Sequence, residues 1–340
     1  MNLPQTDSAP ADAPGADEPA VKIVVTGAAG YIGAATVARL LAAGHLVTGL
    51  DCLRFGGAAL LSSYLTGRFT LARGDIRDHS QVARVLEGAD VVVHLAGIVG
   101  DPACAAEPDL AREVNLDATI ALHAAAGQAG VRRFVFASTC SIYGHCGQPA
   151  DEAAPARPLS LYAQTKVDAE TRLLDAAAGS MATTVLRFAT VYGLAPRMRF
   201  DLVVNAFVAQ ALTSGRVRVF TPAAWRPLIH VADIAGAITS VVHAPVEAVS
   251  GQVFNTGSSD NWQLAEVARV VAEVCGPGIQ IDITPAGADL RDYRISTAKL
   301  TGATGWKAGR RLRTGVEELA SALSAGVLDG HPAISGRTAP

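Results

Sequence analysis

A glycine-rich turn near the N-terminus constrains the fold more than any other feature of the sequence. The apolar, β-branched run at residues 21–26 predicts a short strand, and the apolar positions within residues 32–41 have helical spacing. Gly27, Gly30 and Gly33 stand between them at intervals of three residues. Glycine allows a sharp turn and a close approach of two backbone segments. The segment therefore predicts a strand, a tight turn and a helix.

Strands and helices continue to alternate over the first half of the chain. Further strands are expected at residues 46–51, 69–75, 91–96, 133–138 and 183–187, and helices at residues 80–87, 110–129 and 160–177. This alternation predicts an α/β fold with a doubly wound parallel sheet, the Rossmann architecture. After residue 190 the elements become shorter and less regular, which predicts a smaller, mixed α/β lobe at the C-terminal end.

The glycine turn is also a candidate cofactor site. A helix that begins at such a turn directs its N-terminal N–H groups at a pyrophosphate. Asp51 closes the second strand eighteen residues after Gly33, where a carboxylate can accept hydrogen bonds from the adenosine ribose and repel a 2′-phosphate. We therefore expect NAD in preference to NADP, although the nearby Arg54 could favour the phosphate. Either feature alone could be an ordinary tight turn or strand end.

Two later strand ends offer further contacts to the cofactor. At the end of the third strand, the carboxylate of Asp75 could meet the adenine amino group. At the end of the fourth strand, the small residues that follow His94 leave room for the cofactor to cross the sheet. His94 itself is interpreted as a core histidine whose hydrogen bonds are satisfied within the protein.

These patterns divide the chain into segments. We expect a disordered tail at residues 1–20, which are rich in Pro, Ala and acidic residues, and a loose tail at residues 329–340. The NAD-binding Rossmann domain is expected at residues 21–189, with a returning segment at about 228–257. Residues 190–227 and 258–328 are expected to form the substrate-binding lobe.

Composition excludes several classes of protein. The net charge of −3, without a basic block, lacks the electrostatic footprint of a nucleic-acid-binding protein. No apolar run has the length of a membrane span, and the N-terminus lacks the features of a signal peptide, so we expect a cytoplasmic location. The five cysteines have no metal-ligand spacing, and we expect free thiols and no metal.

Tyr162 and Lys166 form a candidate catalytic pair. They stand four residues apart, so both side chains project from one face of the expected helix. A tyrosine needs roughly 4 kcal/mol of preferential phenolate stabilisation to lower its pKa from about 10 to about 7. A nearby lysine and the positive nicotinamide ring can supply it together. Tyr162 could then remove a hydroxyl proton while hydride leaves the same carbon.

Hydroxyl residues at the end of an earlier strand support this pair, which alone could occur by chance on many helices. Active groups in a doubly wound sheet gather at the carboxyl ends of the strands. Thr139 follows the strand at residues 133–138 and could share a short hydrogen bond with the reacting hydroxyl. Lys166 has a second possible role, which is to hold the nicotinamide ribose.

Together these motifs are similar to those of the extended short-chain dehydrogenase/reductase family, the nucleotide-sugar epimerases and dehydratases. The resemblance covers about residues 21 to 325. It rests on the glycine turn, Asp51, Asp75-Ile76, His94-Leu95-Ala96-Gly97, Asn115, Ser138-Thr139 with Tyr143-Gly144, Tyr162 with Lys166, Leu186-Arg187-Phe188, Val191-Tyr192-Gly193, Arg226 with Ile229-His230-Val231, and Arg291.

The resemblance implies a tightly held NAD, a catalytic trio and a lobe that grips a nucleoside diphosphate sugar. It also implies a homodimer that pairs through the helices at residues 110–129 and 160–177. The implied catalytic residues are Thr139, Tyr162 and Lys166. The implied cofactor-binding residues are Gly27, Gly30, Tyr31, Ile32, Gly33, Asp51, Asp75, Ile76, Leu95, Ala96, Gly97 and Lys166. The implied substrate-binding residues are Ser138, Cys140, Ser141, Thr190, Arg199, Arg226 and Arg291.

The departures from the family pattern narrow the expected activity. Dehydratases of the family carry an Asp-Glu pair where this chain has Cys140-Ser141, so a 4,6-dehydratase is not expected. Thr190 stands where the family usually has Asn. Cys140 could act as a thiol acid or base, but a small buried residue is the simpler interpretation. Arg197 and Arg199 could meet a phosphate, a sugar carboxylate or solvent.

Three functions remain open on the sequence alone. The first is an NAD-dependent nucleotide-sugar 4-epimerase, which oxidises C4 and returns hydride to the other face of the sugar. The second is an NAD(P)-dependent nucleotide-sugar 4-ketoreductase or dehydrogenase that uses the same residues. The third is a non-catalytic cofactor-binding scaffold, since a fold does not fix a function.

Overall fold

The computed structural model describes residues 20–176, 181–284, 291–328, 330–331 and 334. The tails expected at residues 1–20 and 329–340 lie almost entirely outside these residues. Within the described part of the chain, no helix combines the length and the apolar character needed to cross a membrane.

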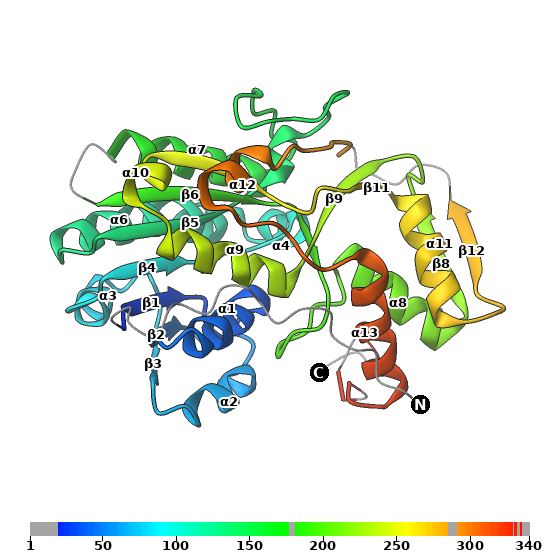
Figure 1. The fold of residues 1–340 in the computed structure, drawn as a ribbon, viewed down its shortest axis with the longest axis horizontal. Coiled ribbons are helices and arrows are strands. Elements are labelled where there is room, and N and C mark those ends of the chain that lie inside the picture. The colour runs from blue at the N-terminus through cyan, green and yellow to red at the C-terminus, as the bar shows by residue number, and fades with distance from the viewer. Residues whose placement is uncertain (1–19, 177–180, 285–290, 329, 332–333, 335–340) are drawn as a thin grey trace.

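A seven-stranded sheet forms the centre of the molecule (Figure 1). Its strands are β1 (Lys22–Thr26), β2 (Leu46–Asp51), β3 (Phe69–Arg73), β4 (Val91–His94), β5 (Arg133–Thr139), β6 (Ala182–Phe188) and β10 (Gln252–Thr256). They lie in the order β10-β6-β5-β4-β1-β2-β3, and every neighbouring pair is parallel. This order reverses direction between β1 and β4, as in a doubly wound Rossmann sheet. The predicted fold class is therefore confirmed.

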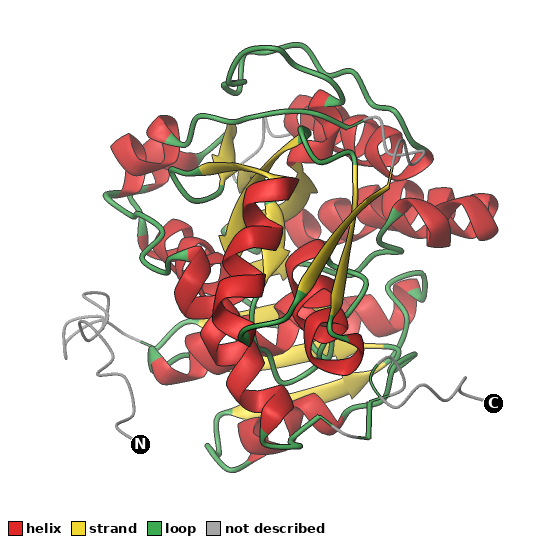
Figure 2. Cartoon of the chain, turned by 90° about the vertical axis from the view of Figure 1, so that its right-hand side faces the viewer, coloured by secondary structure: helices red, strands yellow, loops and turns green. Residues whose placement is uncertain are grey.

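Helices cover both faces of this sheet (Figure 2). The helices and helical turns of this part are α1 (Tyr31–Ala42), η1 (Ala58–Leu60), α2 (Leu61–Tyr64), α3 (His79–Leu86), α4 (Asp101–Ala106), α5 (Pro108–Arg112), η2 (Glu113–Asp117), α6 (Ala118–Gln128), η3 (Cys140–Tyr143), α7 (Leu161–Asp175), α9 (Val231–His243) and α10 (Val246–Val249). Helices α1 and α9 pack together, whereas α6 packs against both α3 and α7.

Alternating side chains of the strands divide the interior into two cores. In β1, Ile23 and Val25 contribute to one core and Val24 contributes to the other. Successive side chains of a strand point to opposite faces, so a sheet that is covered on both sides needs apolar residues at every position. Its strands therefore read as continuous apolar runs in the sequence.

A smaller lobe lies at the right of Figure 1. Its strands are β7 (Thr190–Tyr192), β9 (Trp225–His230) and β11 (Asn261–Gln263) in one sheet, and β8 (Arg216–Phe220) and β12 (Gln280–Thr284) in another. Its helices include α8 (Val203–Ser214), α11 (Leu264–Cys275) and α13 (Leu312–Ser324), which contact one another, and the chain also forms α12 (Ala298–Thr304). Residues 228–257 were expected to return to the Rossmann sheet. Of the strands in this interval, β10 pairs with β6 of that sheet, whereas β9 pairs with β7 and β11 of the smaller lobe.

The helix expected at residues 110–129 is confirmed, and it contains a π-helical turn that the sequence pattern did not predict. The π-helical turn η2 separates α5 from α6. Asn115 lies in this turn, and its buried side chain bonds the backbone of Ile98 instead of facing solvent. Such π-helical turns often accompany functional sites.

Candidate functional site

The glycine turn forms a cradle with no room for side chains. Gly27 adopts a left-handed φ of 69° between β1 and the turn. A Cβ added to Gly27 would lie 2.8 Å from the backbone nitrogen of Ala96, and one added to Gly33 would lie 2.0 Å from the carbonyl oxygen of Gly27. Helix α1 begins at Tyr31, and among the described residues no side chain caps its start. This geometry fits a pyrophosphate, which the N-terminal N–H groups can bind.

Asp51 lies beside the cradle at the end of β2. Its Oδ2 accepts a hydrogen bond of 2.9 Å from the N–H of Ala29, and its Oδ1 accepts one of 2.7 Å from the N–H of Leu53. The carboxylate therefore stands at the mouth of the turn, where an adenosine ribose can reach it. Arg54 forms an ion pair of 2.9 Å with Glu107, so its guanidinium is already engaged by a carboxylate.

Asp75 and Ile76 follow β3 as the sequence predicts. Ile76 is buried, and Asp75 forms an ion pair of 2.8 Å with Arg77, which also pairs with Glu113. The hydrogen bond from Arg77 holds the pKa of the Asp75 carboxyl below its usual range. A contact between Asp75 and adenine remains a prediction, and an adenine at this position would meet the Arg77 guanidinium as well.

His94 is a core histidine, as predicted. Its Nδ1 lies 2.7 Å from the hydroxyl of Thr26 and its Nε2 lies 2.9 Å from the hydroxyl of Thr119. Burial lowers the pKa of the imidazole to about 3, so the ring is neutral. The Thr26 hydroxyl also accepts the N–H groups of Leu95 and Ala96 at 3.2 Å, which fixes the end of β4 beside the glycine turn.

Gly97 continues this strand end toward the catalytic candidates. A Cβ at Gly97 would lie 3.0 Å from Oδ1 of Asn115 and 3.8 Å from Nζ of Lys166. Asn115 binds both backbone groups of Ile98, at 2.8 Å to the N–H and 2.9 Å to the carbonyl. The predicted small residues thus let the amide and the ammonium approach the strand end closely.

Lys166 lies in the interior beneath this site. Its ammonium donates a hydrogen bond of 2.9 Å to the carbonyl of Ala137 and lies 4.6 Å from the ring centroid of Phe136. The side chain is 4% exposed. Burial lowers the pKa of Lys166 to about 8, and the negative charge of Glu170 opposes that change. The ammonium therefore remains charged at neutral pH, close to its titration range.

Tyr162 lies in the first turn of α7, one turn before Lys166, and Ser160 caps the start of this helix. Burial raises the pKa of Tyr162 to about 12, whereas the charge of Arg199 and a hydrogen bond with Thr139 act in the opposite direction. The Thr139 hydroxyl also lies 3.0 Å from that of Ser141. The structure thus brings the hydroxyls of Tyr162, Thr139 and Ser141 together at the end of β5.

Ser138 and Cys140, which the resemblance implies as substrate contacts, both bond to groups in the interior. The Ser138 hydroxyl donates a short hydrogen bond to Glu170. The Cys140 thiol is fully buried and donates to the carbonyl of Arg187 at 3.0 Å, and burial raises its pKa. The physical reason for Ser138 is the alternation of a strand, which turns it away from Thr139. Cys140 fits its simpler interpretation as a small buried residue.

Two arginines from the smaller lobe meet near this site. The buried Arg226 lies on β9, and its guanidinium donates to the carbonyls of Trp225, at 2.9 Å, and of Arg291. The Arg291 guanidinium lies 3.4 Å from the carboxylate of Asp101, which follows β4. The expected pair is thus brought together although its members are far apart in the sequence.

Thr190 and Arg199 occupy the segment that joins the two parts of the molecule. Thr190 begins β7 and hydrogen-bonds Tyr293 through its side chain. Arg199 forms a bidentate ion pair with Asp201, at 2.5 and 3.1 Å, and its charge reaches Tyr162. Both therefore border the site, with their side chains already engaged by neighbours.

A buried polar network that the sequence did not predict lies behind the site. Glu170 forms a bidentate ion pair with Arg187, whose closest contact is 2.7 Å, and both side chains are nearly inaccessible to solvent. Arg187 also donates to the Tyr143 hydroxyl at 2.8 Å. The position of Glu170 one turn after Lys166 was the available signal.

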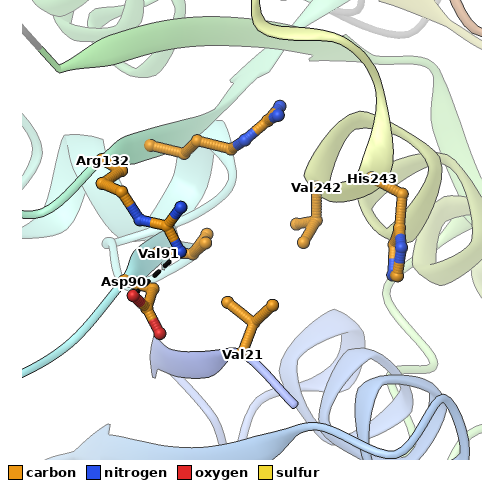
Figure 3. A pocket seen from close by; sticks show the side chains of 7 residues that line it. Val21, Asp90, Val91, Arg132, Val242 and His243 are labelled. Carbon is orange, nitrogen blue, oxygen red and sulfur yellow. Dashed lines mark hydrogen bonds and ion pairs between the residues drawn. The ribbon is translucent and has the colours of Figure 1, made fainter. Parts of the chain in front are cut away.

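A separate pocket lies at the opposite end of the strands. Figure 3 shows this cavity of about 270 Å³, which is lined by residues that include Val21, Asp90, Arg132 and His243. Its walls include the residues at which β4 and β5 begin. Ligands of doubly wound sheets bind beyond the carboxyl ends of the strands, so we assign no catalytic role to it. Within the described ranges, no cluster of three or more His, Cys, Asp or Glu is arranged to hold a metal ion.

Comparisons with known proteins agree with this geometry. The model of the NAD dependent epimerase/dehydratase family matches residues 23–257. A UDP-glucose 4-epimerase of Mycolicibacterium smegmatis is 31% identical over 309 residues, which are 87% of this chain and 96% of that protein. A UDP-N-acetyl-alpha-D-glucosaminuronate decarboxylase of Bacillus cytotoxicus is 28% identical over 74% of this chain and 80% of its own.

A solved structure shares the same fold and binds the expected kind of ligand. MoeE5, in complex with UDP-glucuronic acid and NAD, superimposes with a TM-score of 0.79 at 28% sequence identity. The match covers 90% of this chain and 99% of MoeE5. The cradle described above accordingly corresponds to a fold that holds NAD.

Proposed function

Because this chain belongs to the NAD dependent epimerase/dehydratase family, we propose that it is a nucleotide-sugar 4-epimerase. Membership makes it an NAD-dependent nucleotide-sugar epimerase or a related oxidoreductase. The observation that carries the finer proposal is the cluster of Thr139, Tyr162 and Lys166 at the carboxyl end of β5, next to the glycine cradle.

The cradle and its neighbours would hold NAD. The N–H groups at the start of α1 would bind the pyrophosphate, Asp51 the adenosine ribose, and Lys166 the nicotinamide ribose. When bound, oxidised nicotinamide accepts a hydride and places a positive charge beside the phenol. Lys166 lies against Gly97 at the site edge, from where its ammonium can reach a ribose hydroxyl by releasing the Ala137 carbonyl.

Tyr162 would take the proton from the C4 hydroxyl of the sugar. Its pKa of about 12 must fall by about 5 to suit a base at neutral pH, which requires about 7 kcal/mol of phenolate stabilisation. The Arg199 guanidinium is a protein charge that acts in this direction, and the Lys166 ammonium would add to it. Thr139 hydrogen-bonds the phenol and would orient the sugar hydroxyl toward it. After the keto-sugar has rotated, the hydride would return to the opposite face of C4 and the proton from Tyr162 to the C4 oxygen, so that inversion involves no net oxidation.

Arg226 and Arg291 would grip the diphosphate. Guanidinium groups bind phosphate oxygens through two parallel hydrogen bonds. Both arginines lie on the smaller lobe, where Arg226 bonds the Arg291 carbonyl and Arg291 reaches Asp101 beyond the end of β4. The relatives named above act on or bind UDP-sugars, so UDP is the first nucleotide to test. The diphosphate at this end and the C4 hydroxyl at Tyr162 would set the orientation of the sugar between them.

A contact across the cofactor side of the molecule favours the epimerase over a dehydrogenase. The guanidinium of Arg197 lies 3.9 Å from the ring centroid of Phe55. Phe55 follows the strand that ends in Asp51, whereas Arg197 belongs to the segment after β7. Burial lowers the pKa of Arg197, and the charge of Asp51 acts against that change. The contact would cover the adenosine side of NAD, and a retained cofactor suits an enzyme with no net redox change.

The alternative is a nucleotide-sugar 4-ketoreductase or dehydrogenase on the same residues. It would consume or form reduced nicotinamide in every cycle and would require NAD to leave. A non-catalytic scaffold is disfavoured because Thr139, Tyr162 and Lys166 are all present and in contact with the same strand end.

The deciding experiment incubates the purified protein with a panel of UDP-, dTDP- and GDP-sugars. Sugar configuration is followed by NMR and nicotinamide by absorbance. Inversion at C4 without an absorbance change would support the epimerase. Stoichiometric formation or loss of reduced nicotinamide would support the alternative, and no conversion of any sugar would contradict both.

We also propose that two copies pair through α6 and α7. These helices pack against each other, and they leave Ala124 and Gln164 exposed and Val167 half-buried. Sedimentation equilibrium should give twice the mass of the chain. A monomer at micromolar concentration would contradict the pairing.

A further inference from the structure

Asp101 carries a buried oxygen that none of the described residues satisfies. It follows Gly100, whose φ is 91°, at the start of α4, immediately beyond the strand end that forms part of the site. One carboxylate oxygen, Oδ2, lies 3.4 Å from the guanidinium of Arg291. The other, Oδ1, is buried and has no hydrogen-bond partner among the described residues.

An unsatisfied buried acceptor is unusual in a folded protein. At least about 90% of buried polar groups have a hydrogen-bond partner, because an unpaired one loses its hydration without compensation. A carboxylate is an acceptor only, so the missing partner must be a donor. Such an atom at the edge of a binding site points to a donor on the ligand.

The surroundings of Asp101 place it between the two ends of the site. Its negative charge raises the pKa of Tyr162 and of the Cys104 thiol, although burial contributes more to both. Helix α4 also packs against α7, which carries Tyr162. On the other side, the ion pair joins Asp101 to Arg291. Asp101 therefore lies beside the path from the diphosphate arginines to the phenol.

We propose that Oδ1 of Asp101 accepts a hydrogen bond from a hydroxyl of the substrate's sugar ring. This inference rests on the proposed function, in which the sugar lies between Arg291 and Tyr162. A charged acceptor recognises a hydroxyl more strongly than a neutral one does. Asp101 would thus select sugars that carry this hydroxyl and would fix the ring while C4 reacts.

A purely structural role makes a different prediction. If Asp101 only held Arg291 in place, its loss would weaken the grip on the diphosphate. UDP alone and every UDP-sugar would then bind more weakly by the same factor. A direct bond to one hydroxyl instead affects only the sugars that possess it.

The test combines protein variants with deoxy sugars. Asp101→Ala and Asp101→Asn are compared with wild type, and Asp109→Asn serves as a control, because Asp109 is a fully exposed carboxylate on the next short helix. The ligands are the nucleotide sugar that the wild-type enzyme converts, its 2-, 3- and 6-deoxy analogues, and UDP. The readouts are kcat/KM for the sugars and the dissociation constant for UDP.

We expect kcat/KM of the wild type to fall about 10- to 100-fold when one particular hydroxyl is absent, as for loss of a hydrogen bond to a charged group. Asp101→Ala should lose a similar factor on the complete sugar and little more on that deoxy analogue. Asp101→Asn should lie between them, Asp109→Asn should match wild type, and UDP binding should change less than about threefold. A melting curve for each variant controls for folding.

Equal losses for Asp101→Ala on the complete sugar and on every deoxy analogue would overturn the inference, as would unchanged kcat/KM in that variant. Either result leaves the proposed function standing if the wild type still converts the complete sugar. A wild-type enzyme that neither binds nor converts any nucleotide sugar would overturn the proposed function and, with it, this role of Asp101.

Discussion

Replacing Lys166 by methionine is expected to make the folded protein more stable while it abolishes turnover. The ammonium is buried, and its pKa of about 8 compares with an ordinary value of 10.5. The difference, 10.5 − 8, or about 2.5, corresponds to about 3 kcal/mol of destabilisation of the folded state at neutral pH. Methionine removes this charge but also the hydrogen bond to the Ala137 carbonyl, worth about 1 kcal/mol. The variant should therefore gain about 2 kcal/mol at pH 7.

The stability advantage of Lys166→Met should decrease as the pH rises. Between pH 8 and about pH 10.5, the unfolded wild-type chain keeps a proton on Lys166 that the folded protein releases. The free energy of unfolding contributed by this group therefore rises with pH through that window. Lys166→Met lacks the group, so its advantage should be full below pH 8 and absent near pH 10.5.

The assay is urea unfolding of both proteins at several pH values between 7 and 10.5. Lys307→Met is the control, because this exposed side chain should change the free energy of unfolding by less than about 0.5 kcal/mol. A Lys166→Met variant that is less stable than wild type at pH 7, or an advantage that does not change with pH, would refute the reasoning.

Two further predictions concern the cradle and the network behind the site. Gly33→Ala should weaken NAD binding by more than about tenfold in calorimetry, because its Cβ would lie 2.0 Å from a carbonyl oxygen, whereas Gly302→Ala meets no atom within 4 Å and should bind normally. Equal affinities would contradict this account. Glu170→Gln should lower the free energy of unfolding by about 3–5 kcal/mol, because it leaves the buried charge of Arg187 unpaired. Glu273→Gln removes the exposed ion pair with Arg313 and should lower the free energy of unfolding by at most about 1 kcal/mol. A similar loss of stability in both variants would show that burial is not the cause.

The fold could be predicted from the sequence because its signals are local. The apolar runs of β1 and β4 and the spacing of glycines between β1 and α1 specify a strand, a turn and a helix without long-range knowledge. The π-helical turn at Asn115 could not be predicted this way. It depends on a bond to the backbone of Ile98, seventeen residues earlier, which no local pattern encodes.

The parts of the candidate site that depend on local sequence spacing could also be predicted. Tyr162 and Lys166 share a helix face, so their spacing alone places them together. The interior hydrogen bonds of Ser138 and Cys140 could not be predicted, because their side-chain directions depend on strand register and on the start of η3. The residues next to Asp101 in the sequence do not predict its ion pair with Arg291. That contact depends on how two segments far apart in the sequence pack together.

The most direct test of the central claim is the turnover of Tyr162→Phe. This substitution removes the phenol hydroxyl, which hydrogen-bonds Thr139. With the nucleotide sugar that the wild-type enzyme converts, the variant should bind NAD and UDP normally, since neither contact requires the phenol oxygen. Its rate of inversion at C4 should fall by about 10²- to 10⁴-fold, the usual contribution of a positioned acid or base. Inversion at the wild-type rate in Tyr162→Phe would contradict the mechanism.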